Sequence, residues 1–253
     1  MSAARPTPPL IIAHRGSPAR APENTLASFA RAVDEGARCI ECDVRLARDG
    51  VPVLMHDATL QRTTDRSGYV AAHTHAELDA ADAGAWFDVA FMGCRIPTLE
   101  EVLAWRPYDV RMMLELKRGG LGVHTTRDLA EAVVARIHAA DATRAVIVTS
   151  FSHAVLRAVR AIDDEIELGQ LQYGPAIKVG LVRRLERVQA AWYIRSVRTV
   201  GVADVRAMHA AGIRVAVYTA NTARDVRHAL ECGVDAIITN ELPFVRSLLQ
   251  DSR

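Results

Sequence analysis

Residues 145–149 read Ala145-Val146-Ile147-Val148-Thr149, a short β-branched run that is apolar at nearly every position. Segments with helical periodicity lie on both sides of it, at about 126–140 and 153–162. A run that is apolar on both faces must be covered on both, as parallel strands flanked by helices are. The stretch therefore predicts a helix–strand–helix unit of an α/β fold.

The same alternation extends along the chain in both directions. Eight runs predict strands, at Leu10–Ala13, Cys39–Val44, Val110–Leu116, Ala145–Thr149, Ile166–Leu171, Ala191–Ile194, Arg214–Tyr218 and Asp235–Thr239. Helical patterns lie between them, at about 26–33, 98–103, 126–140, 153–162, 176–188, 202–211, 222–231 and 243–250. Eight strands alternating with about eight helices predict a closed (β/α)8 TIM barrel. A doubly wound open sheet is the competing architecture.

One segment interrupts this rhythm. Asp49-Gly50 is a strong hairpin-turn signal, and residues 51–55 alternate like a strand after it. No clear strand–helix unit is visible over 57–107, so we expect a small insertion there, after the second barrel strand. Since no linker or repeat marks a second domain, residues 1–253 are predicted to form a single TIM-barrel domain with this insertion inside it.

Composition narrows the function classes. Hydrophobic residues make up 50% and charged residues 24% of the 253 positions, which is typical of a soluble globular protein. The formal net charge of +1 gives no electrostatic reason to expect a nucleic-acid partner. No apolar run is long enough for a transmembrane helix, and residues 1–10 do not resemble a secretory signal. Four cysteines cannot form a disulfide scaffold, so the cytoplasm is the expected location.

Two of the predicted strands carry acidic side chains. Because side chains alternate along a strand, Glu41 and Asp43 point to one side, and Glu115 shares a face with Lys117. Active sites of TIM barrels lie at the carboxyl ends of the strands, where these positions fall. We therefore expect three carboxylates to converge at one mouth of the barrel.

Three carboxylates in one place repel each other. Two like charges about 4 Å apart repel by roughly 4 kcal/mol at an effective dielectric constant near 20. Either each acid is paired with an arginine, or a divalent cation is bound. Because both strands carry acidic residues at matching positions, a bound divalent cation is the preferred interpretation. A set of ligands that are all oxygen atoms favours Mg²⁺ or Ca²⁺ over zinc.

Histidines and cations are predicted to lie at the same mouth. His14 ends the first strand and is followed by Arg15, while His56 ends the hairpin that follows the second strand. Two histidines beside a metal suit acid–base chemistry near neutral pH. Arg15 and Lys117 supply positive charge for an anionic group. The alternative for each histidine is a structural hydrogen-bonding role.

Other candidate ligands carry less weight. His73 and His75 resemble a metal pair, but they lie in an alanine-rich part of the insertion with no third ligand nearby, so a metal site is not favoured there. His124 and His153 stand at loop–helix junctions and are candidates for the rim. Cys39 and Cys42 have redox spacing, but on a strand this spacing sends the two sulfurs to opposite faces.

Taken together, the motifs resemble the glycerophosphodiester phosphodiesterase family. They occur in family order from about residue 10 to 243, and they are His14-Arg15-Gly16, Pro22-Glu23-Asn24-Thr25, Glu41-Cys42-Asp43-Val44, Asp49-Gly50, His56-Asp57 with Arg62-Thr63-Thr64, Ile96-Pro97-Thr98-Leu99, Leu114-Glu115-Leu116-Lys117 and Gly233-Val234-Asp235 through Thr239. Three departures fall at Tyr218, where tryptophan is usual, at Asn240–Pro243 and at Trp192–Arg198.

The resemblance implies a function for each candidate residue. It makes Glu41, Asp43 and Glu115 metal ligands, His14 and His56 the general acid and base, and Arg15 and Lys117 the cations that contact phosphate. The implied reaction is metal-dependent hydrolysis of a glycerophosphodiester, a small-molecule substrate, to sn-glycerol 3-phosphate and an alcohol. His14 is the expected base and His56 the expected acid, with water or the glycerol hydroxyl of the substrate as nucleophile.

Two alternatives remain open. One is a lysophospholipase D that acts on single-chain lipids, for which Trp86-Phe87 and Phe91-Met92 in the insertion could form an apolar lip. The other is a barrel that binds phosphodiesters without cleaving them. The identity of the alcohol, the choice between Mg²⁺ and Ca²⁺ and the oligomeric state are not predicted.

Overall fold

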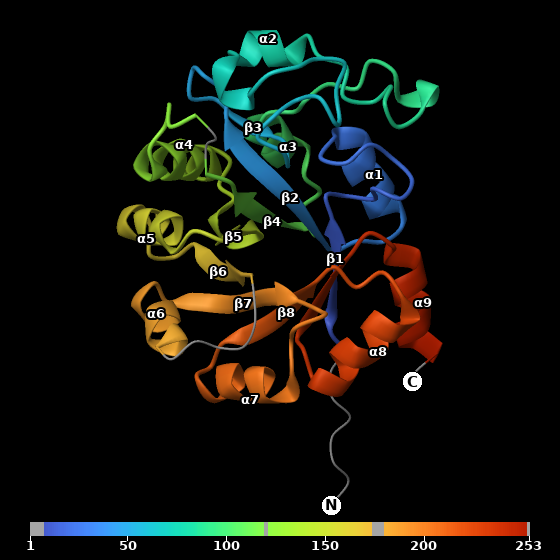
Figure 1. Ribbon diagram of the computed structural model, residues 1–253, viewed down its shortest axis with the longest axis vertical. Coiled ribbons are helices and arrows are strands. Elements are labelled where there is room, and N and C mark those ends of the chain that lie inside the picture. The colour runs from blue at the N-terminus through green and yellow to red at the C-terminus, as the bar shows by residue number, and fades with distance from the viewer. Residues whose placement is uncertain (1–7, 119–120, 174–179, 252–253) are drawn as a thin grey trace, which may run out of the picture.

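The computed structural model describes residues 8–118, 121–173 and 180–251, and in these residues eight parallel strands close into a barrel (Figure 1). The strands are β1 (Leu10–His14), β2 (Cys39–Leu46), β4 (Arg111–Leu116), β5 (Val146–Ser150), β6 (Glu167–Gln172), β7 (Ala190–Ser196), β8 (Arg214–Tyr218) and β9 (Ala236–Thr239). Each pairs in parallel with its neighbours, and the pairing of β1 with both β2 and β9 closes the barrel. The predicted TIM barrel is confirmed.

Helices cover the outside of the barrel (Figure 1). They are α1 (Leu26–Asp34), α3 (Leu99–Trp105), α4 (Thr126–Ala139), α5 (His153–Ile162), α6 (Leu181–Arg187), α7 (Val202–Ala210), α8 (Ala223–Cys232) and α9 (Leu242–Asp251), with a short 3₁₀ turn at Thr143–Ala145. Thr25, Thr98, Thr125 and Thr222 cap four of them by accepting a backbone N–H with the side-chain oxygen. Residues 176–179, the first part of the helix predicted at 176–188, lie outside the described residues.

Alternation along the strands divides the buried apolar residues into two layers. Met113, Ile147 and Ile238 pack inside the barrel, whereas Met112 and Val148 pack between the strands and the helices. This division explains why the strand sequences are apolar at consecutive positions. It also separates the two cysteines of the redox-like spacing, because Cys39 belongs to the inner layer and Cys42 to the outer one.

The segment after β2 has a small core of its own. β3 (Pro52–Leu54) pairs antiparallel with β2, and the chain then forms α2 (His75–Asp79) and the 3₁₀ turns η1 (Val70–Ala72) and η2 (Val89–Phe91). Leu60, Val70, Leu78 and Ile96 are among its buried residues. α3 instead packs on the main core through Leu99, Val102 and Leu103. The range 57–107 thus contains both the insertion and one helix of the barrel wall.

Among the described residues, no helix combines the length and the apolar character that crossing a membrane would require.

Candidate active site

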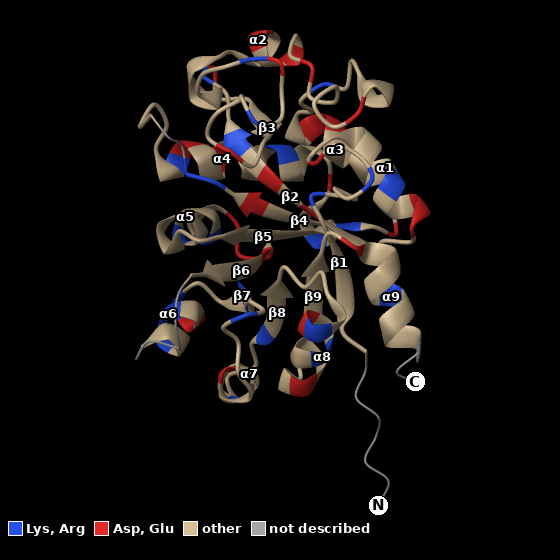
Figure 2. Ribbon diagram, turned by 45° about the vertical axis from the view of Figure 1, so that its right-hand side comes forward, with Lys and Arg blue, Asp and Glu red and all other residues tan. Residues whose placement is uncertain are grey.

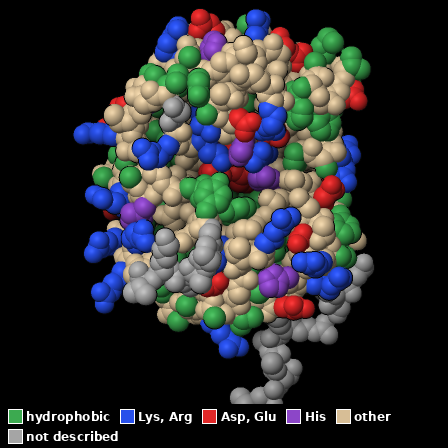
Figure 3. All heavy atoms as spheres, viewed as in Figure 1, with side chains coloured by type: hydrophobic (Ala, Val, Ile, Leu, Met, Phe, Trp, Pro, Cys, Tyr) green, Lys and Arg blue, Asp and Glu red, His purple; other side chains and the backbone are tan. Residues whose placement is uncertain are grey.

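A cavity of about 120 Å³ opens at the carboxyl ends of the barrel strands. One wall carries charged and histidine side chains from β1, β2 and β4 and the segments that follow them, among them His14, Glu41 and Lys117. The opposite wall is aromatic, with Phe151 and Tyr218. Figure 3 shows this hollow in the middle of one face, where acidic and histidine side chains gather beside hydrophobic ones.

The three predicted carboxylates come together at this cavity, which Glu41 and Glu115 line and beside which Asp43 is buried. Glu41 and Asp43 lie on β2, and Glu115 lies opposite Asp43 on the neighbouring strand β4. Figure 2 shows acidic positions in red on both strands. All three are buried, and each offers an oxygen within 4.8 Å of the others. The convergence follows from strand alternation and from the parallel register of β2 and β4. Within the described part of the chain, these are the residues grouped closely enough to hold a metal ion, and His73 and His75 are not among them.

Cations neutralise part of this negative charge. Lys117 Nζ lies 3.0 Å from Asp43 Oδ1 and also contacts Glu115. Arg15 Nε lies 3.2 Å from Asp43 Oδ2. Glu41 is held differently, because it accepts the backbone N–H of Arg15 at 3.0 Å. Basic side chains are therefore paired with Asp43 and Glu115, whereas little positive charge compensates the negative charge of Glu41.

The pKa values reflect this difference. Burial, together with the charges of Asp43 and Glu115, raises the pKa of Glu41 well above its usual value. Burial and Asp43 likewise raise the pKa of Glu115. Burial acts in the same direction on Asp43, but Lys117 and Arg15 outweigh it and lower the pKa of this carboxyl. The folded protein thus pays a free-energy cost for keeping the three groups ionised without a further cation.

Two carboxylate oxygens in this group have only the Lys117 ammonium as a close partner. Asp43 Oδ1 and Glu115 Oε1 are buried, and each contacts Lys117 Nζ, which leaves further lone pairs on both oxygens without a partner among the described residues. Buried polar atoms are rarely left unsatisfied in proteins. Buried, converging oxygens with free lone pairs suit a hard divalent cation, so the site fits the metal that the sequence predicts.

His14 lies at the end of β1, beside the carboxylates. Its Nδ1 is 2.6 Å from Oδ1 of Asn240, which follows β9, and its Nε2 is 3.8 Å from Glu41 Oε2. Because an amide oxygen only accepts, the His14 ring carries a proton on Nδ1 and leaves Nε2 as the acceptor. Burial and the charge of Arg15 lower the pKa of His14 to about 4.

His56 lines the same cavity from the segment that follows β3. Its Nδ1 lies 2.6 Å from Asp57 Oδ1, and Arg45 fixes its backbone by donating to its carbonyl oxygen. Burial lowers the pKa of His56, while Asp43 and Asp57 oppose that shift. The two histidines therefore have different partners, since an amide supports His14 and a carboxylate supports His56.

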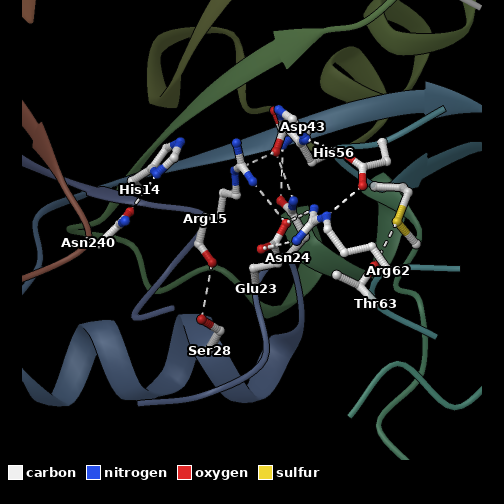
Figure 4. Close-up of polar contacts among 12 residues, drawn as sticks. His14, Arg15, Glu23, Asn24, Ser28, Asp43, His56, Arg62, Thr63 and Asn240 are labelled. Atoms are coloured by element: carbon white, nitrogen blue, oxygen red, sulfur yellow. Dashed lines mark hydrogen bonds and ion pairs between the residues drawn. The ribbon is translucent and has the colours of Figure 1, made fainter. Parts of the chain in front are cut away.

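The loop that holds Arg15 depends on a close backbone approach. Arg15 and Gly16 both have positive φ, at 54° and 91°. A Cβ atom at Gly16 would lie 2.8 Å from the backbone carbonyl carbon of Ser28 and would also overlap the Ser28 hydroxyl. In Figure 4, the Arg15 side chain points toward Asp43, and its carbonyl oxygen accepts the Ser28 hydroxyl. Glycine is thus required here for both its φ and its small size.

We expect Gly16→Ala to destabilise the protein by about 2–3 kcal/mol, because both the positive φ and the contact with Ser28 become unfavourable. Thermal denaturation followed by circular dichroism measures this change. Gly50→Ala is the matched control, since Gly50 has φ 81° but open space around its Cβ position. Equal losses in both variants would show that the approach to Ser28 contributes nothing.

Three further residues complete the site. They were not among the candidates that residue type and position on the strands predict. Asn24 donates to Asp43 Oδ2 at 2.8 Å and accepts the Asp43 backbone N–H. Glu23 accepts a hydrogen bond from Arg15, and Asn240 Oδ1 contacts His14 Nδ1. Glu23 and Asn24 belong to a motif of the resemblance, which is the signal that could have identified them. Asn240 belongs to one of the departures from the family pattern, which marks the position but gives no indication of its contact with His14.

The opposite wall contains one of the three sequence departures. Tyr218 lies at the end of β8, donates to the Gln172 carbonyl oxygen at 3.1 Å and packs edge-on against Phe151. His153 lines a neighbouring pocket, and His124 is bonded to the Ala47 carbonyl oxygen. Neither of these histidines lines the main cavity.

A TIM barrel whose mouth holds buried carboxylates, two histidines and two cations has the architecture of an enzyme that acts on phosphate esters. The model of the Glycerophosphoryl diester phosphodiesterase family matches residues 14–242. The chain therefore belongs to this family, and it is an enzyme of the phosphoric diester hydrolase class. The resemblance stated from the sequence motifs is confirmed.

Similar proteins cover nearly the whole chain. A glycerophosphodiester phosphodiesterase from Caldanaerobacter subterraneus subsp. tengcongensis is 33% identical over 235 residues, which are 92% of this chain and 94% of that protein. A phosphodiesterase from Oleispira antarctica, solved in complex with the product sn-glycerol-3-phosphate, matches with a TM-score of 0.85 at 31% identity, over 96% of this chain and 97% of that one. A glycerophosphodiester phosphodiesterase from Agrobacterium tumefaciens matches with a TM-score of 0.76 at 26% identity, over 94% and 99%.

Proposed function

We propose that the protein hydrolyses glycerophosphodiesters to sn-glycerol 3-phosphate and an alcohol, with a divalent cation, Mg²⁺ or Ca²⁺, held by Glu41, Asp43 and Glu115. The observation that carries the proposal is the group of three buried carboxylates, with oxygens within 4.8 Å of one another and Lys117 as the cation that contacts two of them. When bound, such a cation polarises a phosphoryl oxygen and lowers the pKa of a coordinated hydroxyl.

Arg15 and Lys117 bind the phosphate. Both side chains line the cavity, and both are mostly buried against the carboxylates. Asp43 and Glu115 raise the pKa of Lys117 despite its burial, so it stays protonated. Preorganised cations of this kind stabilise the negative charge that develops on the phosphoryl oxygens in the transition state.

The histidines divide the proton transfers. His14, neutral with Nε2 as its acceptor, takes the proton from the attacking hydroxyl as the phosphorus–oxygen bond forms. His56 gives a proton to the oxygen of the departing alcohol as the second phosphorus–oxygen bond breaks. The Asp57 carboxylate beside Nδ1 supports this order, because it stabilises the imidazolium form of His56.

The glycerophosphodiester class of substrate is proposed from the similarity of this chain to a solved relative. The Oleispira antarctica protein, which is 31% identical, holds sn-glycerol-3-phosphate as its product. The second candidate is lysophospholipase D activity, which is favoured by the exposed Trp86 and Met92 in the insertion. Trp86 packs edge-on against Phe87, Met92 is largely exposed, and neither side chain lines the main cavity.

The test is a substrate panel with and without a chelator. We expect glycerol 3-phosphate to be released from glycerophosphocholine or glycerophosphoethanolamine, release to stop in excess EDTA, and Mg²⁺ or Ca²⁺ to restore it. Faster turnover of lysophosphatidylcholine than of glycerophosphocholine would favour the lysophospholipase D alternative. Full activity in excess EDTA would contradict the proposed metal dependence.

A further inference from the structure

An arginine of the insertion, Arg62, bridges two acidic side chains at the edge of the active site. Arg62 donates Nη1 and Nη2 to the two oxygens of Glu23, at 2.9 and 2.7 Å, and Nε to Asp57 Oδ2 at 2.5 Å. Figure 4 shows its guanidinium pointing between Glu23 and the His56 side of the cavity. Arg62 itself does not line the cavity, so it is placed to act through these two acids.

Each of these acids also holds a residue that lines the cavity. The second Asp57 oxygen contacts His56 Nδ1 at 2.6 Å, and Glu23 Oε1 accepts Arg15 Nη1 at 2.9 Å. The contacts therefore run without a break from His56 through Asp57, Arg62 and Glu23 to Arg15. Arg15 in turn lies beside the carboxylate of Asp43.

The Arg62 contacts differ from an ordinary surface ion pair. Its side chain is 44% exposed, and single exposed pairs contribute little because solvent screens them. Here the guanidinium makes a bidentate contact to one carboxylate and a third hydrogen bond to another, and Glu23 is only 13% exposed. Bidentate arginine–carboxylate contacts fix direction as well as distance. The arrangement can therefore hold both acids in one orientation.

We propose that Arg62 is a positioning residue for the phosphodiesterase reaction, which orients His56 through Asp57 and Arg15 through Glu23 at the same time. The inference rests on the proposed function, because it assumes that His56 protonates the leaving alcohol and that Arg15 binds phosphate. Two charged residues of the insertion, Asp57 and Arg62, thereby support His56 and Arg15.

The contact of Arg62 with Asp57 and its contact with Glu23 affect different parts of the reaction. If Asp57 loses its partner, its carboxylate can turn away and His56 Nε2 no longer points at the departing oxygen. That loss slows only substrates whose leaving group needs a proton. If Glu23 loses its partner, Arg15 shifts and phosphate binding weakens for every substrate.

The experiment compares two substrates that share the glycerophosphoryl group. Glycerophosphocholine releases an alkoxide that needs protonation, whereas the p-nitrophenyl ester of glycerol 3-phosphate releases a stable anion that does not. The ratio of kcat/KM on the two substrates measures how strongly the reaction depends on protonation of the leaving group by His56. Partial misfolding of a variant lowers both rates alike, so the ratio does not depend on the folded fraction.

For Arg62→Gln we expect kcat/KM to fall on both substrates, and about tenfold more on glycerophosphocholine than on the nitrophenyl ester. Asp57→Asn should reproduce only the loss on glycerophosphocholine. Glu23→Gln should lower both rates equally. His56→Ala tests the underlying assumption, because it should change the ratio more than any of them.

Arg95→Gln is the matched control. Arg95 also lies in the segment after β2 and bridges two carboxylates, Asp79 and Glu101, but contacts no residue of the cavity. Its ratio should equal that of the unmodified protein. An unchanged ratio in Arg62→Gln together with a changed ratio in His56→Ala would overturn the role of Arg62 alone. An unchanged ratio in His56→Ala would overturn the proposed acid instead.

Discussion

Glu41→Gln is expected to lower kcat/KM on glycerophosphocholine by about 10³-fold, which corresponds to ~4 kcal/mol of transition-state stabilisation. Glutamine keeps the shape of the side chain, and its amide oxygen can still accept the backbone N–H of Arg15. What it removes is one of the three anionic ligands of the proposed cation. Initial rates at saturating Mg²⁺ or Ca²⁺ measure the loss.

The same substitution should stabilise the metal-free protein. The pKa of Glu41 is raised in the folded state by burial and by Asp43 and Glu115, so its ionised form is less favourable there than in the unfolded chain. A neutral amide avoids that cost. In EDTA we therefore expect a higher Tm for Glu41→Gln than for the unmodified protein, although the variant is nearly inactive.

Added metal should reverse this order of Tm values, so that the unmodified protein is more stable than Glu41→Gln. Cation at 100 times its Kd stabilises a protein by about 2.7 kcal/mol, and Glu41→Gln should lose most of that gain. Glu231→Gln, at an exposed position on α8, is the control and should behave like the unmodified protein in both conditions. A variant that keeps the full metal-dependent increase in Tm would show that Glu41 is not a ligand.

The barrel and its carboxylates were predictable because they depend on a regular repeat. Side chains alternate along β2, so Glu41 and Asp43 had to share a face, and parallel pairing places Glu115 opposite Asp43. The strand bounds needed only small changes, as with the run predicted at 145–149, which the structure has at Val146–Ser150.

The contacts that orient these groups were not predictable in the same way. Asn240 reaches His14 across 226 positions, and Arg62 reaches Glu23 across 39. Both depend on where loops place their side chains, and no periodicity governs loops. The same limit applies to α3, which lies in the range 57–107 but packs on the barrel core, since capping signals locate a helix without showing what it packs against.

His14→Ala is expected to lower kcat by about 10²- to 10³-fold while leaving metal binding intact. The carboxylates and the phosphate-binding cations are unchanged in this variant, so KM should change much less than kcat. The reason lies in the contact between His14 Nδ1 and Asn240 Oδ1, which leaves Nε2 as a neutral acceptor beside Glu41. Single-turnover rates and the metal-dependent increase in Tm measure the two properties separately.

A graded series makes this result specific to proton transfer. Asn240→Leu keeps the imidazole but removes the group that fixes its tautomer, so we expect a smaller loss in kcat, about tenfold. His153→Ala is the control, because His153 begins α5 beside the neighbouring pocket and does not line the main cavity. If His14→Ala retained the full rate, another group would have to accept the proton. If no variant changed the rate, the activity measured would not come from this site, and a barrel that only binds phosphodiesters would explain the structure better.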